Sequence, residues 1–258
     1  LDHAEDAVGQ GELAVAVGDG ADDLLEVEGV SACALDDSRD AVAVDGGAER
    51  VGVDQFALRG VQASAEEPLV LAPGVAIVAV DYSATTNGPA FASVDAQGVL
   101  RVTQVTRTQN FMTGEDELSS ESSELRLAAV DRHGIPRWVL LRGQADNAFV
   151  VWEDGHVLRV DVRDLTAPKP VEEVDVLADA GLRVTAVAFL NAKNTLVVGD
   201  STGGLQAWFR TPAPAVEHGD GARMAKAHDL GRGSAAVTAL ASSARTRLLA
   251  VGHQDGSL

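Results

Sequence analysis

The ionisable and nucleophilic side chains of this 258-residue chain show none of the spacings that typically build a reactive centre. The histidines form no HxH or HExxH pair and have no cysteine partner, so their spacing does not indicate a metal site. They are His3, His133, His156, His218, His228 and His253. The serines of residues 119–123 lie outside any G-x-S-x-G context that would mark a nucleophile. We therefore expect no catalytic, cofactor-binding or metal-binding residues.

Acidic pairs and glycine-rich turns are expected to be structural as well. Asp22–Asp23 and Asp36–Asp37 lack the alternating oxygen ligands and the acidic terminus of a calcium loop, which favours solvated turns. Gly18–Gly20 and Gly203–Gly204 are not followed by the GK[ST] sequence of a phosphate-binding loop. No helix is predicted behind either segment, so neither offers a helix N-terminus to an anion.

Composition limits the classes of partner. The net charge is −19, and residues 1–67 carry 17 acidic residues against three arginines. An acidic surface repels phosphate backbones and anionic head groups, which argues against nucleic-acid binding and direct contact with anionic lipid. Cys33 is the single cysteine, so no internal disulfide can form, and its apolar neighbours predict a buried small residue rather than a reactive thiol.

A repeated pattern of short apolar runs predicts the fold. Val184–Phe209 contains three strand-length runs, VTAVAFL, TLVVG and LQAWF, separated by the turn signals NAKN and DSTGG. Val237–Leu258 matches it without a gap at an offset of 53 residues. Each segment predicts an antiparallel meander, and meanders repeated at a fixed period are typical of propeller blades.

Hairpin glycines mark equivalent positions in successive blades. They are Gly98, Gly155, Gly203 and Gly256, spaced by 57, 48 and 53 residues, which exceeds the roughly 40–45 residues of a regular WD40 repeat. Asp154-Gly155 and Asp255-Gly256 predict type I′ turns. We expect Asp255 to bond His228 and Thr238 across its blade, as structural support rather than catalysis.

The blades are expected in residues 68–258, after an acidic, degenerate blade region in residues 1–67 that includes a strand–turn–strand pattern over Val30–Val53. Residues 107–124 are polar and predict a long exposed loop or an outer-strand insertion. Leu125–Val130 is expected to open the next blade, which continues with Trp138–Leu141. The fold class is therefore all-β, a WD40-like β-propeller present as an incomplete fragment of four to five blades.

The three tryptophans are expected in the core or between blades. Trp138, Trp152 and Trp208 fall in or beside predicted strands, where large rings bury apolar area. The acidic pair Glu153–Asp154 directly after Trp152 leaves a ligand platform at that ring as an alternative.

The phrase TLVVGDSTGGLQAWF, an outer strand with Ala-His, and then VTAL resemble a specific family. They are similar to the WD40-like extramembrane domain of certain bacterial ABC-type phosphate transporter permease subunits. The resemblance implies a periplasmic domain of an inner-membrane protein, with a docking or regulatory role in phosphate import. It implies as partners a second permease subunit, an ATPase and a periplasmic phosphate-binding protein. Trp208 is followed by Phe209 where generic WD40 repeats have Asp.

Two other hypotheses share this fold. The first is a free-standing WD40-like scaffold that binds protein partners. The second is a propeller enzyme or cofactor binder, which the small apolar residues of the inner runs VTAVAFL and VTALASS disfavour. On the permease hypothesis, the complete reading frame should encode a hydrophobic span before Leu1 and several after Leu258. Both phosphate sensing and partner docking without sensing are compatible with this sequence, as are four or five blades.

Overall fold

The computed structural model divides the chain into two compact units, Leu1–Val78 and Ala79–Leu258. In the first unit it describes four strands, and it describes the chain from residue 76 onward apart from short gaps. The gaps are residue 87, 110–111, 113, 115, 180, 191, 215–218, 244–245 and 247.

The described strands of the first unit form one mixed sheet. They are β1 (Leu13–Val15), β2 (Leu25–Glu28), β3 (Phe56–Gly60) and β4 (Leu69–Ala72). Their order is β2-β3-β1-β4, and β1 pairs with β3 in parallel. In a blade, consecutive strands are neighbours and pair antiparallel. In this sheet β1 lies between β3 and β4 rather than beside β2, so its strand order differs from that of a blade. The predicted strands over Val30–Val53 lie outside the described residues.

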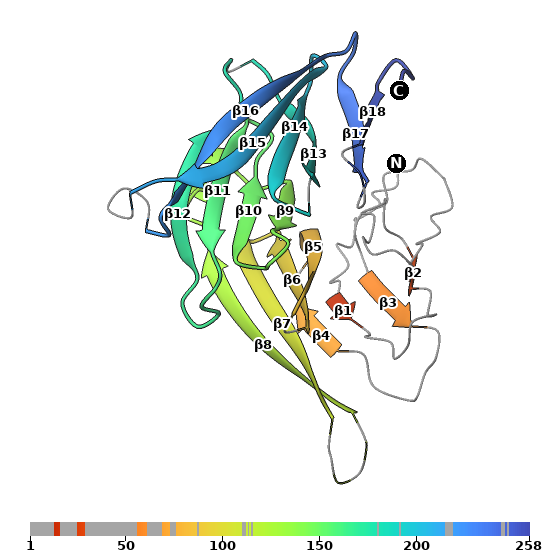
Figure 1. Ribbon diagram of the computed structural model, residues 1–258, viewed down its shortest axis with the longest axis vertical. Coiled ribbons are helices and arrows are strands. Elements are labelled where there is room, and N and C mark those ends of the chain that lie inside the picture. Colours follow the sequence, from red (N-terminus) through yellow and green to blue (C-terminus); the bar gives the residue numbers. More distant parts are fainter. Residues whose placement is uncertain are drawn as a thin grey trace, which may run out of the picture. The chain divides into compact units, whose positions relative to one another are not determined.

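The second unit is built from three four-stranded antiparallel sheets, each paired in chain order (Figure 1). The first contains β5 (Ile77–Thr85), β6 (Gly88–Asp95), β7 (Val99–Gln109) and β8 (Asp116–Arg126). The second contains β9 (Trp138–Leu141), β10 (Asn147–Val151), β11 (His156–Asp161) and β12 (Lys169–Asp175). The third contains β13 (Val184–Leu190), β14 (Thr195–Asp200), β15 (Gly204–Pro212) and β16 (Ala222–Arg232).

A two-stranded hairpin, β17 (Val237–Ser242) and β18 (Leu249–His253), follows the third sheet. It repeats the local structure of β13 and β14. Both pairs contain a register irregularity at the same place, between Val184 and Ala186 and between Val237 and Ala239. The repeat at an offset of 53 residues is therefore confirmed down to its bulge, and with it the predicted succession of blades.

Two segments test the predicted strands around the end of the first blade. Within the polar segment 107–124, residues 107–109 end β7 and residues 116–124 belong to β8, and the two strands pair as far as Gln109 and Asp116, which confirms the outer-strand insertion. The expected strand Leu125–Val130 of the next blade is wrong. Leu125 and Arg126 end β8, and Val130 begins the short helix α1 (Val130–His133). The run is apolar because Leu127 and Ala129 fill the core between the two sheets, which an irregular segment can do as well as a strand.

The core lies between neighbouring sheets. One cluster joins the first and second sheets and includes Leu100, Leu141 and Trp152. Another joins the second and third sheets and includes Phe149 and Leu196. In it, the ring centroids of Phe149 and Phe189 lie 5.4 Å apart. A third continues from the third sheet onto β17. The second and third blades therefore each bury one face against the blade before them and the other against the strands that follow.

An ion pair ties the inner strands of the first three blades together. Lys193, in the turn between β13 and β14, donates from Nζ to Asp81 Oδ1 in β5 at 3.0 Å and also to the carbonyl oxygen of Tyr82. The other carboxylate oxygen of Asp81 accepts the backbone N–H of Leu141 in β9 at 2.6 Å. One carboxylate thus connects β5, β9 and the β13–β14 turn.

Candidate functional site

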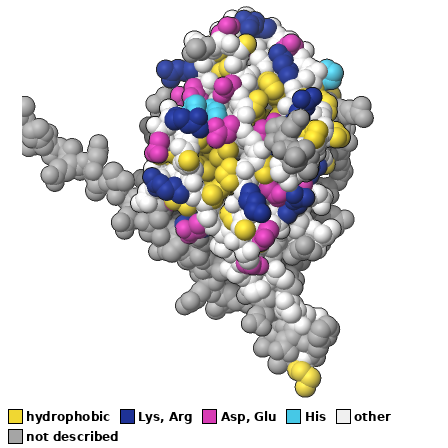
Figure 2. Space-filling model, turned by 90° about the vertical axis from the view of Figure 1, so that its left-hand side faces the viewer, with side chains coloured by type: hydrophobic (Ala, Val, Ile, Leu, Met, Phe, Trp, Pro, Cys, Tyr) yellow, Lys and Arg dark blue, Asp and Glu magenta, His cyan; other side chains and the backbone are white. Residues whose placement is uncertain are grey.

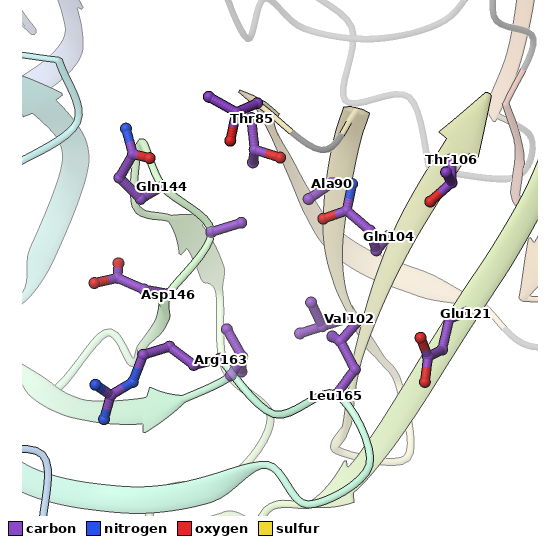
Figure 3. A pocket seen from close by; sticks show the side chains of 13 residues that line it. Thr85, Ala90, Val102, Gln104, Thr106, Glu121, Gln144, Asp146, Arg163 and Leu165 are labelled. Carbon is purple, nitrogen blue, oxygen red and sulfur yellow. The ribbon is translucent and has the colours of Figure 1, made fainter. Parts of the chain in front are cut away.

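A cleft of about 650 Å³ lies between the first and second sheets (Figure 3). Its apolar base comes from both sheets, with Ala90 and Val102 on one side and Val162 and Leu165 on the other. These side chains belong to strands or turns that also form the shared core, so the base is fixed by packing. The size lies within the usual range of ligand pockets, about 300–1,000 Å³.

Hydroxyl and amide side chains surround this base. Figure 3 places Thr85 and Gln104 on the first sheet and Gln144 opposite, in the turn between β9 and β10. Gln104 is held in place because its Nε2 donates to the carbonyl oxygens of Pro89 at 3.0 Å and Val105 at 3.3 Å. The groups that face the cleft from this wall are therefore positioned by the sheet itself.

The close approach of β6 and β7 beside the cleft requires a glycine. Gly88 has φ of 112°, and a Cβ there would lie 2.2 Å from the carbonyl oxygen of Val105. Thr85 Oγ1 donates to the carbonyl oxygen of Gly88 at 2.8 Å and closes the same turn. The wall of the cleft thus depends on one position that accepts no side chain.

The cleft is lined by three charged side chains: Glu121 from the first sheet, and Asp146 and Arg163 from the second. Glu121 lies on β8, and no hydrogen bond or ion pair joins its side chain to another described residue. Arg163 lies on the opposite wall and is tied to Asp161, with Nε and Nη2 donating at 3.0 and 2.5 Å. The hydrogen bond from Arg163 lowers the pKa of Asp161, and the same contact raises the pKa of Arg163. Arg163 is therefore a fixed cation, and the Glu121 carboxylate has no partner among the described side chains.

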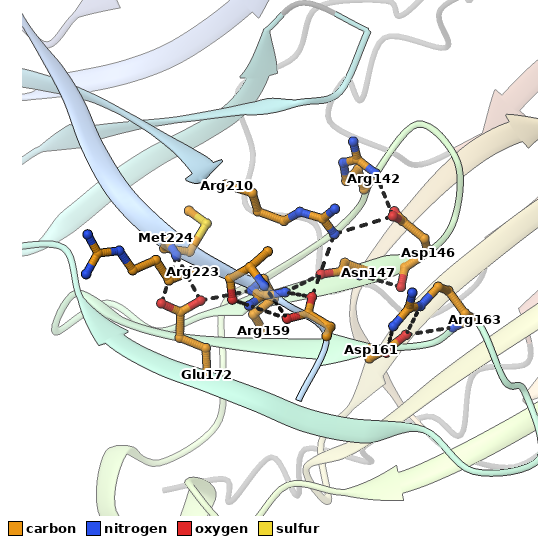
Figure 4. A network of polar contacts seen from close by, with 12 residues as sticks. Arg142, Asp146, Asn147, Arg159, Asp161, Arg163, Glu172, Arg210, Arg223 and Met224 are labelled. Carbon is orange, nitrogen blue, oxygen red and sulfur yellow. Dashed lines mark hydrogen bonds and ion pairs between the residues drawn. The ribbon is translucent and has the colours of Figure 1, made fainter. Parts of the chain in front are cut away.

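A buried ionic network lies next to the cleft and joins the second and third sheets (Figure 4). Its centre is Arg159 on β11, whose side chain is 0% exposed. Nε donates to Glu172 on β12 at 3.0 Å, and Nη1 donates to the amide oxygen of Asn147 at 2.7 Å. Both terminal nitrogens also bond Asp220, in the turn before β16, and Nη2 reaches the carbonyl oxygen of Ala222 at 2.7 Å. This one guanidinium therefore links two blades.

The network extends to the cleft through Asp146. Asp146 Oδ2 accepts from Arg142 at 2.6 Å and from Arg210 at 3.4 Å. Burial lowers the pKa of Arg210. Burial acts to raise the pKa of Asp220, but the hydrogen bonds from Arg159 outweigh it and the pKa is lowered. Most ionisable groups on this side of the cleft are thus engaged in holding blades together.

The predicted hairpin glycines occupy equivalent turns. The N–H groups of Gly98, Gly155, Gly203 and Gly256 each donate to the carbonyl oxygen three residues earlier, and the φ values are 74°, 90°, 87° and 84°. The predicted type I′ geometry is wrong. It needs a positive φ on two successive residues, and neither Asp154 nor Asp255 has one. The glycine alone supplies the positive φ, as in a turn that ends on a bulge.

The predicted set of His228, Thr238 and Asp255 does not form. Asp255 accepts from the hydroxyl of Ser234 and from the hydroxyl and N–H of Ser257, which lowers its pKa to about 2. Thr238 donates to the carbonyl oxygen of Gly252 at 3.1 Å. The donors to Asp255 come from Ser257, two residues later, and from Ser234, in the connection between β16 and β17, whereas His228 lies on the outer strand β16. Asp255 therefore has a structural role as predicted, but its partners are Ser234 and Ser257.

The equivalent aspartate of the second blade does bond a histidine. His133 at the end of α1 pairs with Asp154 at 2.5 Å, and its ring stacks on His156 with centroids 3.9 Å apart. His156 in turn contacts Asp175 on β12 at 3.0 Å. Burial acts to raise the pKa of Asp154, but hydrogen bonds from His133 and from the N–H of His156 lower it overall. The cluster fastens α1 to its blade.

The tryptophans have structural positions. Trp152 is 1% exposed and donates from Nε1 to the carbonyl oxygen of Gly134 at 2.7 Å, so its ring is not a ligand platform. Trp138 and Trp208 pack against the core between the second and third sheets. The predicted packing role is confirmed for all three.

The other candidate residues divide between described and undescribed parts. Ser119, Ser120, Ser122 and Ser123 lie on β8, and Gly203 and Gly204 form a hairpin turn. His253 contacts the carbonyl oxygen of Ala235 at 3.0 Å. The remaining candidates lie outside the described residues: Cys33, His3, His218, Gly18–Gly20, Asp22–Asp23 and Asp36–Asp37.

Surface charges of opposite sign commonly pair in the second unit. Figure 2 shows one face on which apolar side chains gather in the middle and acidic and basic side chains surround them. Arg132 pairs with Glu173 at 2.8 Å, and Arg137 pairs with Glu153 at 2.7 Å. Within the described part of the chain, no three His, Cys, Asp or Glu side chains are grouped so that they could hold a metal ion.

No described helix has the length and apolar character that crossing a membrane would require.

Sequence reasoning missed Arg159, Glu121 and Asp220. One signal was present for Arg159, because a single arginine interrupts the apolar run HVLRV of a central strand. A charge at such a position calls for a buried partner. Glu121 belongs to a run of serines and glutamates that looks uniformly solvated, and Asp220 lies 61 residues from Arg159.

Comparison with known proteins shows the fold. No family model matches the chain, and no curated protein matches it. Among solved structures, it is similar to the β-propeller domain of Cps50 (Swd1) from Myceliophteria thermophila, with a TM-score of 0.51 and 17% identity. The match covers 79% of this chain and 61% of that one, so the chain spans about three fifths of the solved domain. The predicted all-β, WD40-like β-propeller architecture is confirmed.

Proposed function

We propose that this chain is a non-catalytic docking domain, a WD40-like propeller that binds other proteins. The observation that carries the proposal is the open polar cleft between the first and second blades, next to a buried network that locks the second blade to the third. Rigid neighbouring elements with outward hydrogen-bonding groups suit recognition, because little conformational freedom is lost on binding.

The state of the ionisable groups supports a role without catalysis. Acid–base catalysis needs a group whose proton can leave or arrive near neutral pH. Asp146 is engaged by Arg142, and Arg163 is engaged by Asp161, so these side chains act as structural ions. Glu121 faces the cleft, and no described base or nucleophile is bonded to its side chain, an arrangement suited to attracting a cation.

The finer proposal places the domain in a phosphate transporter. The resemblance of TLVVGDSTGGLQAWF and VTAL to permease-associated propellers supports a periplasmic domain of an inner-membrane ABC permease subunit. Its partners would be the phosphate-binding protein, the second permease subunit and the ATPase. The rival proposal is a free-standing scaffold, which has the same fold and cleft but binds proteins unrelated to transport.

Cross-linking of the protein expressed from the full reading frame tests the transporter proposal and the scaffold proposal. The chain carries 39 Asp and Glu but only three lysines, so a carboxyl-reactive linker samples its surface better than an amine-reactive one. We expect cross-links from the second unit to the phosphate-binding protein or the second permease subunit, identified by mass spectrometry. Cross-links only to proteins unrelated to phosphate transport would favour the free-standing scaffold, and a lack of any specific protein cross-link would remove the docking role.

A further inference from the structure

We propose that the cleft between the first and second blades binds an extended peptide segment of the partner, with a basic side chain of that segment facing Glu121. This inference rests on the proposed docking function and specifies its site. It names the chemistry of the partner's contact segment, not the identity of the partner.

The position of Glu121 provides the charge argument. It is exposed on β8 and lines the cleft, and no described residue pairs with it. The cation on the opposite wall, Arg163, is already neutralised by Asp161 at 2.5 and 3.0 Å. An entering cation would therefore meet an available carboxylate at Glu121. The second unit itself is acidic, with 22 Asp and Glu against 17 Lys and Arg, which adds a long-range attraction for basic segments.

The polar groups around the base match a polypeptide backbone. Gln144 carries an amide with both donor and acceptor atoms, and Thr86 and Thr106 carry hydroxyls. Gln104 offers its amide oxygen as an acceptor, because its Nε2 already donates to Pro89 and Val105. A peptide in extended form presents alternating N–H and C=O groups that such side chains can bond. Between them, Val102 and Leu165 offer an apolar base for a small side chain. The volume of about 650 Å³ accommodates a short segment rather than a folded domain.

The cleft suits a peptide better than a sugar. Sugar rings are commonly bound by stacking on aromatic side chains, and none of the described residues that line the cleft is aromatic. The walls are also fixed beforehand, because Gly88 allows the close contact of β6 and β7 and Gln104 is bonded to Pro89 and Val105. A preformed groove reduces the ordering cost of binding a flexible segment.

The test uses the full chain and three synthetic nonapeptides of alternating alanine and serine with a central Arg, Gln or Glu. Binding is followed by NMR through the backbone amides and the side-chain NH₂ signals of Gln104 and Gln144. We expect the arginine peptide to shift both glutamine signals. It should bind more tightly than the glutamine peptide by up to about fivefold, the effect of one exposed ion pair, and the glutamate peptide should bind most weakly.

Two variants and a control locate the contact. Glu121→Gln should remove the preference for the arginine peptide and leave the glutamine peptide unchanged. Thr106→Trp should fill the cleft and weaken all three. Glu124→Gln is the control, since it lies on the same strand at odd spacing, faces the other side and pairs with Arg101 at 2.8 Å. It should change nothing in peptide binding.

The outcomes separate this proposal from the docking function. Equal binding of the three peptides, no binding, or binding that survives both cleft variants would overturn the cleft proposal. If cross-links to a partner protein persist in Thr106→Trp while peptide binding is absent, docking stands and another surface carries it. If the arginine peptide binds as expected but partner cross-links are absent, the cleft is a peptide site and the wider assignment fails.

Discussion

Arg159 shows how a single side chain can hold two blades together. It lies in the middle of β11 between apolar neighbours, and burial of an unpaired guanidinium at that depth would be prohibitive. Glu172, Asp220 and Asn147 supply oxygen acceptors around it, and the carbonyl of Ala222 supplies another. The planar guanidinium can bond all of them at once, which an ammonium group cannot.

Removal of this arginine should be strongly destabilising. In Arg159→Met, the carboxylates of Glu172 and Asp220, 7% and 2% exposed, lose their main cation. Breaking a buried pair costs about 3–5 kcal/mol, because the remaining charge stays buried. Urea denaturation measures the loss. The control is Arg183→Ala, which breaks an exposed pair with Glu153 and should cost less than about 1 kcal/mol. Equal losses in the two variants would contradict the role of Arg159.

Asp220 should make stability depend on pH in the acidic range. Its pKa in the folded protein lies below the usual value, while an unfolded Asp titrates near about 3.9. A lowered pKa gives stability that is fully present above the unfolded value and is lost as pH falls through the folded one. The difference in unfolding free energy between wild type and Asp220→Asn should therefore be largest above about pH 5 and shrink towards pH 3. Urea unfolding of both proteins between about pH 3 and about pH 7 measures this difference. A difference that does not change with pH would contradict the stabilising role of the Asp220 carboxylate.

The hairpin turns show what a glycine does at the scale of the element. Gly203 and Gly256 occupy the same turn position, with φ of 87° and 84°. Their surroundings differ. A Cβ at Gly203 would lie 2.5 Å from the carbonyl oxygen of Ala235 and 2.8 Å from that of Gly233, whereas nothing lies within 4 Å of a Cβ at Gly256. The first turn supports the chain that leads to the next hairpin, and the second is open.

Alanine substitutions at these two glycines separate strain from contact. Gly256→Ala should cost about 1–2 kcal/mol, the penalty of a left-handed conformation for a residue with a Cβ. Gly203→Ala should cost clearly more, because the same penalty is joined by a clash with backbone that cannot rotate away. Thermal denaturation of both variants gives the comparison. Equal shifts in Tm would show that the contact between this turn and the next hairpin is loose.

The blades were predictable from sequence because each depends on local pattern. The apolar runs and glycine turns of one meander lie within about 25 consecutive residues, so they can be recognised in the sequence. The repeat of Val184–Phe209 at Val237–Leu258 therefore identified the architecture. Leu125–Val130 was misassigned because apolar content alone cannot tell a strand from an irregular segment that fills the core. The cleft was not predictable, since Gln104 and Gln144 lie on different blades and come to line one cleft only when the two blades pack side by side.

At the scale of the second unit, the blades depend on one another. The core cluster between the first and second sheets and the cluster between the second and third share the second sheet, whose strand β10 is buried along its whole length. Lys193 and Asp81 add a contact from the third blade to the first. In an array stabilised by nearest-neighbour interfaces, damage at one interface spreads as far as the coupling between interfaces allows.

Leu141→Ala measures that coupling. Leu141 is 0% exposed in the core between the first and second blades, and its truncation should cost about 2–5 kcal/mol. If the three sheets unfold as one unit, hydrogen exchange in β6, β10 and β14 should accelerate by the same factor, although β14 lies outside that core cluster. Mass spectrometry of peptides covering the three strands gives the three rates. Faster exchange in β6 and β10 with β14 unchanged would mean that the third blade opens independently, and that the Lys193–Asp81 contact does not bind it to the others.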